Sequence, residues 1–287
     1  MELPVLRRQS GSEGRSRMRR ILSALLLVLL SSVSPPVWAQ GLGEAVEVRQ
    51  SARIVSGGAT RTLTKGSGVA SGDSIKTNGS GQVQMVFPDE TKIVVGANSD
   101  LKIDETLFRK DGTARKFAVT ALGGSFRFLS GSSEERVFKL ATPLATLGIR
   151  GTAFDYTVSA DRGTDLLVFE GVVRFCSKDR RCATVPGGCQ AVTILLDGSF
   201  IQPTTTEEKR ELLRRSFPLL GDQSGLRPPF RTSTVGCQAV KLIRLPGNPD
   251  DEDRNPGSRR NGGAGNDRGN PADGPSDPPG TDGNPAD

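Results

Sequence analysis

From Glu44 to Leu196 the chain alternates apolar and polar residues with a period of two, in short segments that turn residues separate. Such alternation is typical of strands that bury one face. The segments recur at a spacing of roughly 8–12 residues, which predicts an all-β domain: a sandwich, a jelly roll or a coiled β-helix. The expected strands are 45–49, 82–87, 91–95, 100–104, 116–119, 125–129, 137–140, 154–158, 165–169, 172–175 and 191–195.

Turns are expected between these strands because Pro fixes φ, whereas Gly and Asn readily adopt positive φ. The expected turns are 88–90, 96–99, 110–112, Gly123-Gly124 and Glu170-Gly171. One helix is predicted over 207–215, where Thr205 and Glu208 form a capping box and Pro218 ends the helix. We expect this helix to belong to a C-terminal strap that Cys237 holds to the β domain.

The N-terminal segment resembles a secretory signal peptide. Arg19 and Arg20 precede an apolar run over 21–30, and small residues lead to Ala39. The run is shorter than the ~20 residues that span a bilayer, so cleavage after Ala39 is expected, with Met18 as a possible true start. An uncleaved signal anchor is the alternative. The mature chain is therefore expected to be periplasmic or secreted, without a transmembrane span.

These features divide the chain into four parts. A signal peptide occupies 1–39, a β domain 40–200, a helical strap 201–245 and a tail 246–287. The tail is rich in Pro, Gly, Asn and Asp and has no apolar period. It cannot bury enough surface to offset the entropy of ordering, so we expect it to be disordered.

The four cysteines, Cys176, Cys182, Cys189 and Cys237, suit an exported chain, in which an even number favours disulfides. Cys176 and Cys182 flank a polar turn between two apolar runs, and opposed hairpin positions can meet the spacing of a disulfide. We favour Cys176–Cys182, which leaves Cys189–Cys237. A four-thiolate zinc site is the alternative, although tight C-x-x-C spacing is absent.

The composition argues against most enzyme classes. The chain has no His, which excludes Ser-His-Asp and Cys-His sites as well as imidazole zinc sites. Aromatic residues make up only 5% of the chain, too few for the stacking platforms of single-strand nucleic-acid binding or for a typical sugar cleft. No block of like charge is dense enough to follow a phosphate backbone. We expect no catalytic residue, cofactor or metal, and no nucleic-acid partner.

Four segments of the β region, in order, resemble the FecR domain family. They are the stretch 66–77 with Asp73, the hairpin 87–99, the run 141–154, and 168–173. The run 141–154 is the strongest, since Ala-Thr-Pro-Leu-Ala-Thr-Leu-Gly-Ile-Arg-Gly-Thr-Ala-Phe resembles the core motif of the family. The resemblance covers roughly 45–196 and implies a periplasmic sensing domain, here a twisted β-sandwich or β-helix-like fold with one short C-terminal helix and a disordered tail.

The chain departs from the transmembrane regulators of that family. Those regulators carry a cytosolic anti-sigma segment, a membrane helix and a C-terminal receptor-contacting domain. None of these is expected here, so the chain resembles a free-standing exported FecR-domain protein. Control of a sigma factor is not carried over.

The resemblance also singles out motif residues: Asp73, Thr142, Pro143, Arg150, Gly151, Thr152, Phe154, Glu170 and Gly171. Arg150 could anchor a carboxylate or phosphate ligand, because its guanidinium presents a planar fork of donors. The favoured interpretation is structural: Arg150 pairs with an internal acid, Asp73 or Asp155, and Gly151 supplies backbone freedom. Asp89-Glu90 is interpreted as solvated turn charge.

The expected function is a non-catalytic binding or sensing module that presents a sheet edge or face to an envelope protein partner. A structural or adhesive surface protein is the alternative. A carbohydrate-active enzyme is a remote third possibility, since glycosidase chemistry requires only two carboxylates.

Overall fold

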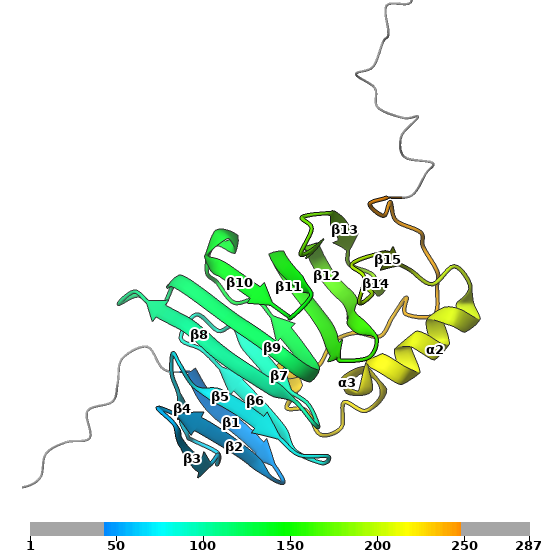
Figure 1. Ribbon diagram of the computed structural model, residues 1–287. Helices are drawn as coiled ribbons and strands as arrows, with labels where there is room; N and C mark the ends of the chain where they lie inside the picture. The colour runs from blue at the N-terminus through cyan, green and yellow to red at the C-terminus, as the bar shows by residue number, and fades with distance from the viewer. Residues whose placement is uncertain (1–42, 248–287) are drawn as a thin grey trace, which may run out of the picture. The chain divides into compact units, whose positions relative to one another are not determined.

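The computed structural model describes residues 43–247 (Figure 1). The signal peptide expected at 1–39 and nearly all of the tail expected from residue 246 lie outside the described residues. Within 43–247, no helix is long and apolar enough to cross a membrane.

The described residues form an all-β fold, as predicted, with fifteen strands in one hydrogen-bonded sheet. The main path through the sheet runs β15-β14-β12-β11-β10-β9-β7-β6-β1-β4, while β2, β3, β5, β8 and β13 branch from it. The strands are β1 (Gly43–Arg49), β2 (Ala52–Ser56), β3 (Ala59–Thr62), β4 (Gly68–Val69), β5 (Ser74–Thr77), β6 (Gln82–Val86), β7 (Lys92–Val95), β8 (Asp100–Phe108), β9 (Ala114–Leu129), β10 (Phe138–Ala141), β11 (Ala145–Ser159), β12 (Gly163–Ser177), β13 (Cys182–Pro186), β14 (Gln190–Ile194) and β15 (Phe200–Ile201).

The long strands β9, β11 and β12 each change partners partway along. The first part of β9 pairs with β8 and β10, and its last part pairs with β7 and β11. Gly123-Gly124, predicted as a turn, lies inside β9 instead: Gly124 has φ +101°, which bends the strand without ending it. The turn predicted at Glu170-Gly171 is wrong for the same reason, because β12 continues through it. These bends fold the sheet over the largest of three hydrophobic clusters in the described residues.

Aromatic side chains form the centre of this core. Phe117 is fully buried, and its ring centroid lies 4.7 Å from that of Phe87, 5.4 Å from that of Phe138 and 6.2 Å from that of Phe128. Each buried side chain of this size stabilises the fold by about 1.5–3 kcal/mol. Phe117 and Phe128 both come from β9, so the bent strand supplies the core on both sides of its bend.

The sequence pattern missed several short strands, namely β2, β3, β4, β5, β13 and β15. They contain two to five residues, and β3 is exposed along its whole length. Segments of this length contain few alternations, and pairing with neighbouring strands decides whether they form strands.

The predicted helix is present as α2 (Thr206–Ser216), with the expected capping box. Thr205 Oγ1 accepts from the Glu208 backbone N–H at 3.1 Å, and the Glu208 carboxylate accepts from the Thr205 backbone N–H at 3.3 Å. Pro218 ends α2 and begins the short helix α3 (Pro218–Gly221). Two 3₁₀ turns, Glu135–Val137 and Pro228–Phe230, complete the elements. Figure 1 shows α2 beside β14 and β15.

Candidate protein-binding face and its supporting clamp

The motif Arg150-Gly151-Thr152 lies at the bend of β11, opposite Glu170-Gly171 in β12. Gly151 has φ +56° and Gly171 has φ +71°, a region that disfavours other residues. A Cβ on Gly171 would overlap the carbonyl oxygen of Gly151. Thr152 and Ser130 share two hydrogen bonds of 2.9 Å. The Thr152 backbone N–H donates to the Ser130 hydroxyl, and the Ser130 backbone N–H donates to the Thr152 carbonyl. These contacts shape the bend of the paired strands.

Arg150 does not pair with Asp73 or Asp155, so that expectation is wrong. Its side chain is 78% exposed, and its Nε lies 3.4 Å from Glu135. The Asp73 carboxylate instead accepts from the Ala70 backbone N–H at 2.8 Å, within its own turn. Asp155 lies beyond the bend, directly opposite Arg127 of β9, and binds it. Arg150 and Asp155 therefore have different partners on the two sides of the bend.

The other motif residues contact the protein itself. Thr142 Oγ1 accepts from the Ala145 backbone N–H at 2.9 Å and shares a hydrogen bond of 3.0 Å with Thr164 Oγ1. Pro143 follows it in the exposed turn before β11. Phe154 is fully buried, with its ring centroid 5.4 Å from that of Phe128.

Asp89 corrects another expectation, because it is buried and not solvated. Its carboxylate accepts from the Thr91 backbone N–H at 3.0 Å and from the Thr91 hydroxyl at 2.9 Å. Its neighbour Glu90 is exposed and has φ +67°. The turn therefore holds one carboxylate as an internal acceptor and leaves the other in water.

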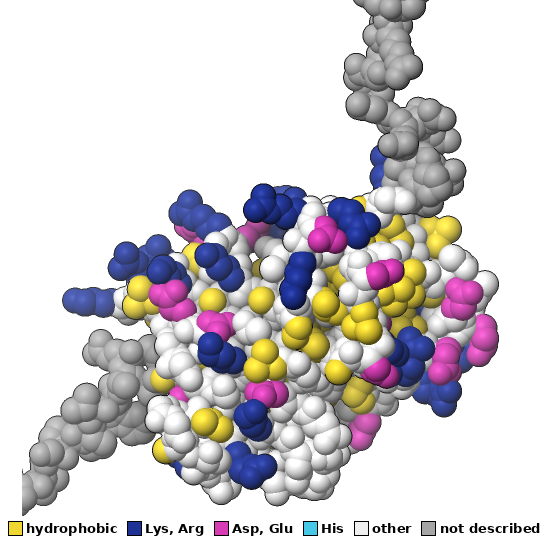
Figure 2. Space-filling view, viewed as in Figure 1, with side chains coloured by type: hydrophobic (Ala, Val, Ile, Leu, Met, Phe, Trp, Pro, Cys, Tyr) yellow, Lys and Arg dark blue, Asp and Glu magenta, His cyan; other side chains and the backbone are white. Residues whose placement is uncertain are grey.

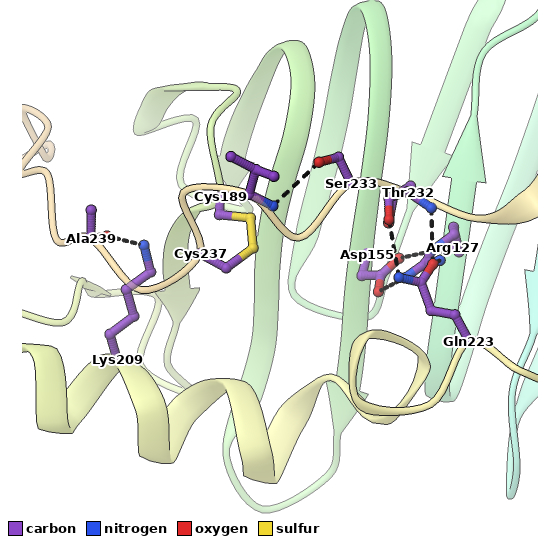
Figure 3. Close-up of a disulfide and its surroundings, with 10 residues drawn as sticks. Arg127, Asp155, Cys189, Lys209, Gln223, Thr232, Ser233, Cys237 and Ala239 are labelled. Carbon is purple, nitrogen blue, oxygen red and sulfur yellow. Dashed lines mark hydrogen bonds and ion pairs between the residues drawn. A yellow bond between two sulfur atoms is a disulfide. The ribbon is translucent and has the colours of Figure 1, made fainter.

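All four cysteines form disulfides, in the pairs that the sequence favours. Cys176 and Cys182 lie opposite each other in β12 and β13. Cys189 joins Cys237 and ties the strap to the start of β14 (Figure 3). A four-thiolate zinc site would need the same sulfur atoms, so the structure is incompatible with that alternative. Among residues 43–247 no cluster of three or more metal-binding side chains occurs.

One face of β9 to β13 is exposed and basic, and we call it the outer face. Gly148 of β11 pairs with Arg174 of β12, and the antiparallel register of β10 brings Lys139 alongside Gly148 on its other side. Lys139 and Arg174 are both exposed, and within residues 43–247 neither has a carboxylate in ion-pair distance. Gly148 places no side chain between them. Figure 2 shows Lys and Arg side chains outnumbering acidic ones along this side of the domain.

The strap packs on β14 and on the parts of β9, β11 and β12 that lie beyond their bends from the outer face, and Arg127 holds it there. The sequence pattern did not single out Arg127. Arg127 and Asp155 are 0% and 2% exposed and form a two-point ion pair with distances of 2.6 and 2.8 Å. The remaining Arg127 N–H groups donate to the strap. One bonds the Gln223 side chain at 2.6 Å (Figure 3), and two others bond the carbonyls of Leu219 and Phe230 at 3.2 Å each. Every donor of this buried cation therefore has an acceptor.

Burial raises the pKa of Asp155, while the hydrogen bonds and charge of Arg127 act in the opposite direction. The sequence did carry a signal for this pair. Arg127 and Asp155 are single charges between aromatic residues in two strong strands. The pairing of Arg127 with Asp155 could be predicted only once β9 and β11 were known to be neighbouring strands.

Gln84 of β6 forms a second clamp on the strap. Its side-chain amide donates to the Gly225 carbonyl at 3.0 Å, and its side-chain carbonyl accepts from the Arg227 backbone N–H at 2.9 Å. Leu226 and Phe230 of the strap pack against Val94 nearby. The sheet thus binds both the backbone and the apolar side chains of the strap.

Residues 73–174 match the family model described as FecR protein, so this part of the chain is a FecR domain. The match begins at Asp73 and includes the bend motif and Arg174. It points to a regulatory or sensing module and away from an enzyme.

Solved structures supply further similarities. Two crystal structures described as "a putative anti-sigma factor" from Parabacteroides distasonis align with TM-scores of 0.38. One is 16% identical and the alignment covers 45% of this chain and 58% of that one; the other is 15% identical, with coverages of 50% and 64%. A structure described as "Cell surface anchoring domain" is 31% identical over 21% of this chain and 80% of that one, with a TM-score of 0.20.

The chain thus spans less than two thirds of the anti-sigma factor structures that it matches. No curated protein matches the chain. The family assignment rests on the FecR model.

Proposed function

We propose that this chain is a non-catalytic, exported FecR-domain module that binds a protein partner in the bacterial envelope. Export is supported by the signal-like leader in the sequence and by the two disulfides, since disulfides persist in oxidising compartments. The proposed location is therefore the periplasm or the extracellular medium. The FecR domain supports a role in regulation or sensing.

The observation that carries the binding role is the pair Lys139 and Arg174 on either side of Gly148. Two unpaired cations on a rigid sheet attract a carboxylate-rich surface, and charge complementarity of this kind speeds association and selects partners. Thr146, exposed on the same face of β11, adds a hydroxyl for hydrogen bonding. The partner is therefore an envelope protein that presents acidic side chains.

The sheet is well suited to hold these cations in place. β11 pairs with β12 along nearly its whole length, and the Cys176–Cys182 disulfide links β12 to β13 at the end of the same face. Because the strap packs on the parts of β9, β11 and β12 beyond their bends, the outer face can bind a partner while the clamp remains intact.

The test is a capture experiment from envelope extract of the native host with charge-reversed bait. The bait carries Lys139→Glu and Arg174→Glu, and the matched control carries Arg53→Glu and Lys241→Glu, two exposed cations away from the outer face. We expect the native chain and the control to capture the same protein in a salt-sensitive way, and the outer-face variant to lose it. Equal capture by both variants would contradict the proposal.

A bait without residues 248–287 separates this surface from the tail. Retained capture supports recognition by the β domain. Capture that disappears with the tail, and persists in the outer-face variant, would show that the β domain is not the recognition element.

A further inference from the structure

A groove lies between α2 and strands β14 and β15, well away from the outer face. One part has a volume of about 510 Å³ and a second part about 250 Å³, and the two parts share Thr193, Ile201 and Arg215 in their walls. Ligand pockets typically measure roughly 300–1,000 Å³. Figure 2 shows hydrophobic side chains gathered over β14 and β15, with acidic side chains around them. The groove is thus large enough for a side chain and its neighbours.

The walls of the groove are acidic, unlike the outer face. Five carboxylates line it against two guanidinium groups: Asp161, Asp165, Asp197, Glu208 and Glu211 against Arg162 and Arg215. Leu196 is 53% exposed and Ile201 is 48% exposed, so apolar surface lies beside the charges. A ligand that matches both features carries a positive charge on an apolar stem.

Asp165 is the residue that points to a ligand. It is 1% exposed, and its Oδ1 accepts from the Thr193 hydroxyl at 2.5 Å. Its Oδ2 has no hydrogen-bond partner. Buried carboxylate oxygens are almost always bonded, because an unmet charged acceptor is costly. Asp165 lines the larger part of the groove, so the missing donor can come from a molecule that binds there.

We propose that this groove receives a lysine side chain of a partner polypeptide, with its ammonium group bonded to Asp165. Thr193 already occupies one carboxylate oxygen, so a single free oxygen remains. The compact ammonium of lysine suits one acceptor atom, whereas the planar fork of arginine is matched to two. The four-carbon stem lies along Ile201, and Leu196 packs against an apolar neighbour of the lysine in the partner's sequence.

This inference goes beyond the proposed function and does not depend on Lys139 or Arg174. It assigns a second recognition site of opposite charge, on another part of the domain. A partner bound at both sites would need acidic and basic surfaces, which increases specificity.

The test is calorimetric titration of the full chain with acetyl-Leu-Lys-Leu-amide. Acetyl-Leu-norleucine-Leu-amide is the uncharged control, and 1,5-diaminopentane represents a free amine. We expect the lysine peptide to bind at least tenfold more tightly than either. Asp165→Asn should weaken its binding at least tenfold, while Glu44→Gln, which removes an exposed carboxylate on β1, should leave it unchanged.

Arg215→Gln provides a second variant that does not disturb a buried group. Arg215 lines both parts of the groove and is exposed. Removing its charge should strengthen lysine-peptide binding severalfold, a gain that a merely structural role would not produce. This variant decides the question even where Asp165→Asn fails to fold.

Three results would overturn the proposal. The first is equal affinity for the lysine and norleucine peptides, or no detectable binding of either. The second is unchanged binding in a folded Asp165→Asn chain. The third is diamine binding as tight as that of the lysine peptide, which would assign the groove to free amines.

Discussion

Arg127 and Asp155 face each other directly across β9 and β11 and form a fully buried two-point ion pair beneath the strap. The pair does more than join two strands, because the free N–H groups of Arg127 bind backbone and side-chain acceptors of the strap. The Arg127 guanidinium also lies 5.2 Å from the ring centroid of Phe169, a cation–π distance. One cation thus links the sheet core to a segment about a hundred residues later in the chain.

Removing one member of this pair should destabilise the protein strongly. Arg127→Met leaves the Asp155 charge buried without a partner, and such losses cost about 3–5 kcal/mol. The double variant Arg127→Met with Asp155→Leu should cost clearly less than Arg127→Met alone, since no buried charge remains. Urea denaturation measures the free energy of unfolding of the native chain, of Arg127→Met and of the double variant. A double variant at least as unstable as Arg127→Met would contradict the account.

The two disulfides should differ in their contribution to stability. In the chain-entropy model a bridge stabilises by restricting the unfolded chain, so it contributes more when it closes a longer loop. Cys189–Cys237 spans 48 residues and Cys176–Cys182 spans 6. That model gives about 4 and about 2 kcal/mol, respectively. Denaturation of the paired Cys→Ala variants tests the ranking, and equal losses would contradict it.

Gly171→Ala should disrupt the bend of β11 and β12. The residue has φ +71°, and a Cβ would overlap the backbone of Gly151. We expect a loss of at least about 2 kcal/mol, because the backbone must move to accept the methyl group. Gly188→Ala is the matched control: it has φ +85°, with no atom within 4 Å of its added Cβ. It should lose about 1 kcal/mol from backbone strain alone.

Thermal unfolding followed by circular dichroism distinguishes these two glycine variants. Similar losses for both would mean that the close approach to Gly151 is not a constraint on the bend.

The capping box of α2 should weaken in acid. Hydrogen bonds from Thr204 and then from the Thr205 backbone hold the pKa of Glu208 below its usual 4.5. The unfolded chain therefore binds a proton more readily than the folded chain between these two values. The contribution of the cap is fully present above pH 4.5 and is lost as the pH falls through the lower, folded-state pKa.

Hydrogen exchange at the Thr204 and Thr205 amides tests this dependence. Protection of both amides should fall in that acidic range in the native chain, and Glu208→Gln should remove the pH dependence. If Glu208→Gln loses protection of the two amides over the same acidic range, the pH dependence belongs to another titrating group.

Several features could be predicted from local patterns alone. The capping box needs only Thr205 and Glu208 three residues apart, and the hairpin disulfide needs only Cys176 and Cys182 on either side of a turn. The two wrong turn predictions share one cause. Gly124 and Gly171 have turn-like identities, but they bend strands whose neighbours keep them paired on both sides. Arg150 was given the wrong partner because Asp155 lies directly opposite Arg127 of β9, a pairing that depends on strand order.

The alternation of apolar and polar residues determined that this chain forms strands, because a period of two places one face of each strand in the core. The cysteine spacing favoured the bridges for a similarly local reason. Tertiary structure alone decided what lies together: the Arg127–Asp155 clamp, the Lys139–Gly148–Arg174 row and the groove around Asp165. Each of these joins residues from separate strands, and strand order depends on how the whole sheet folds over its core.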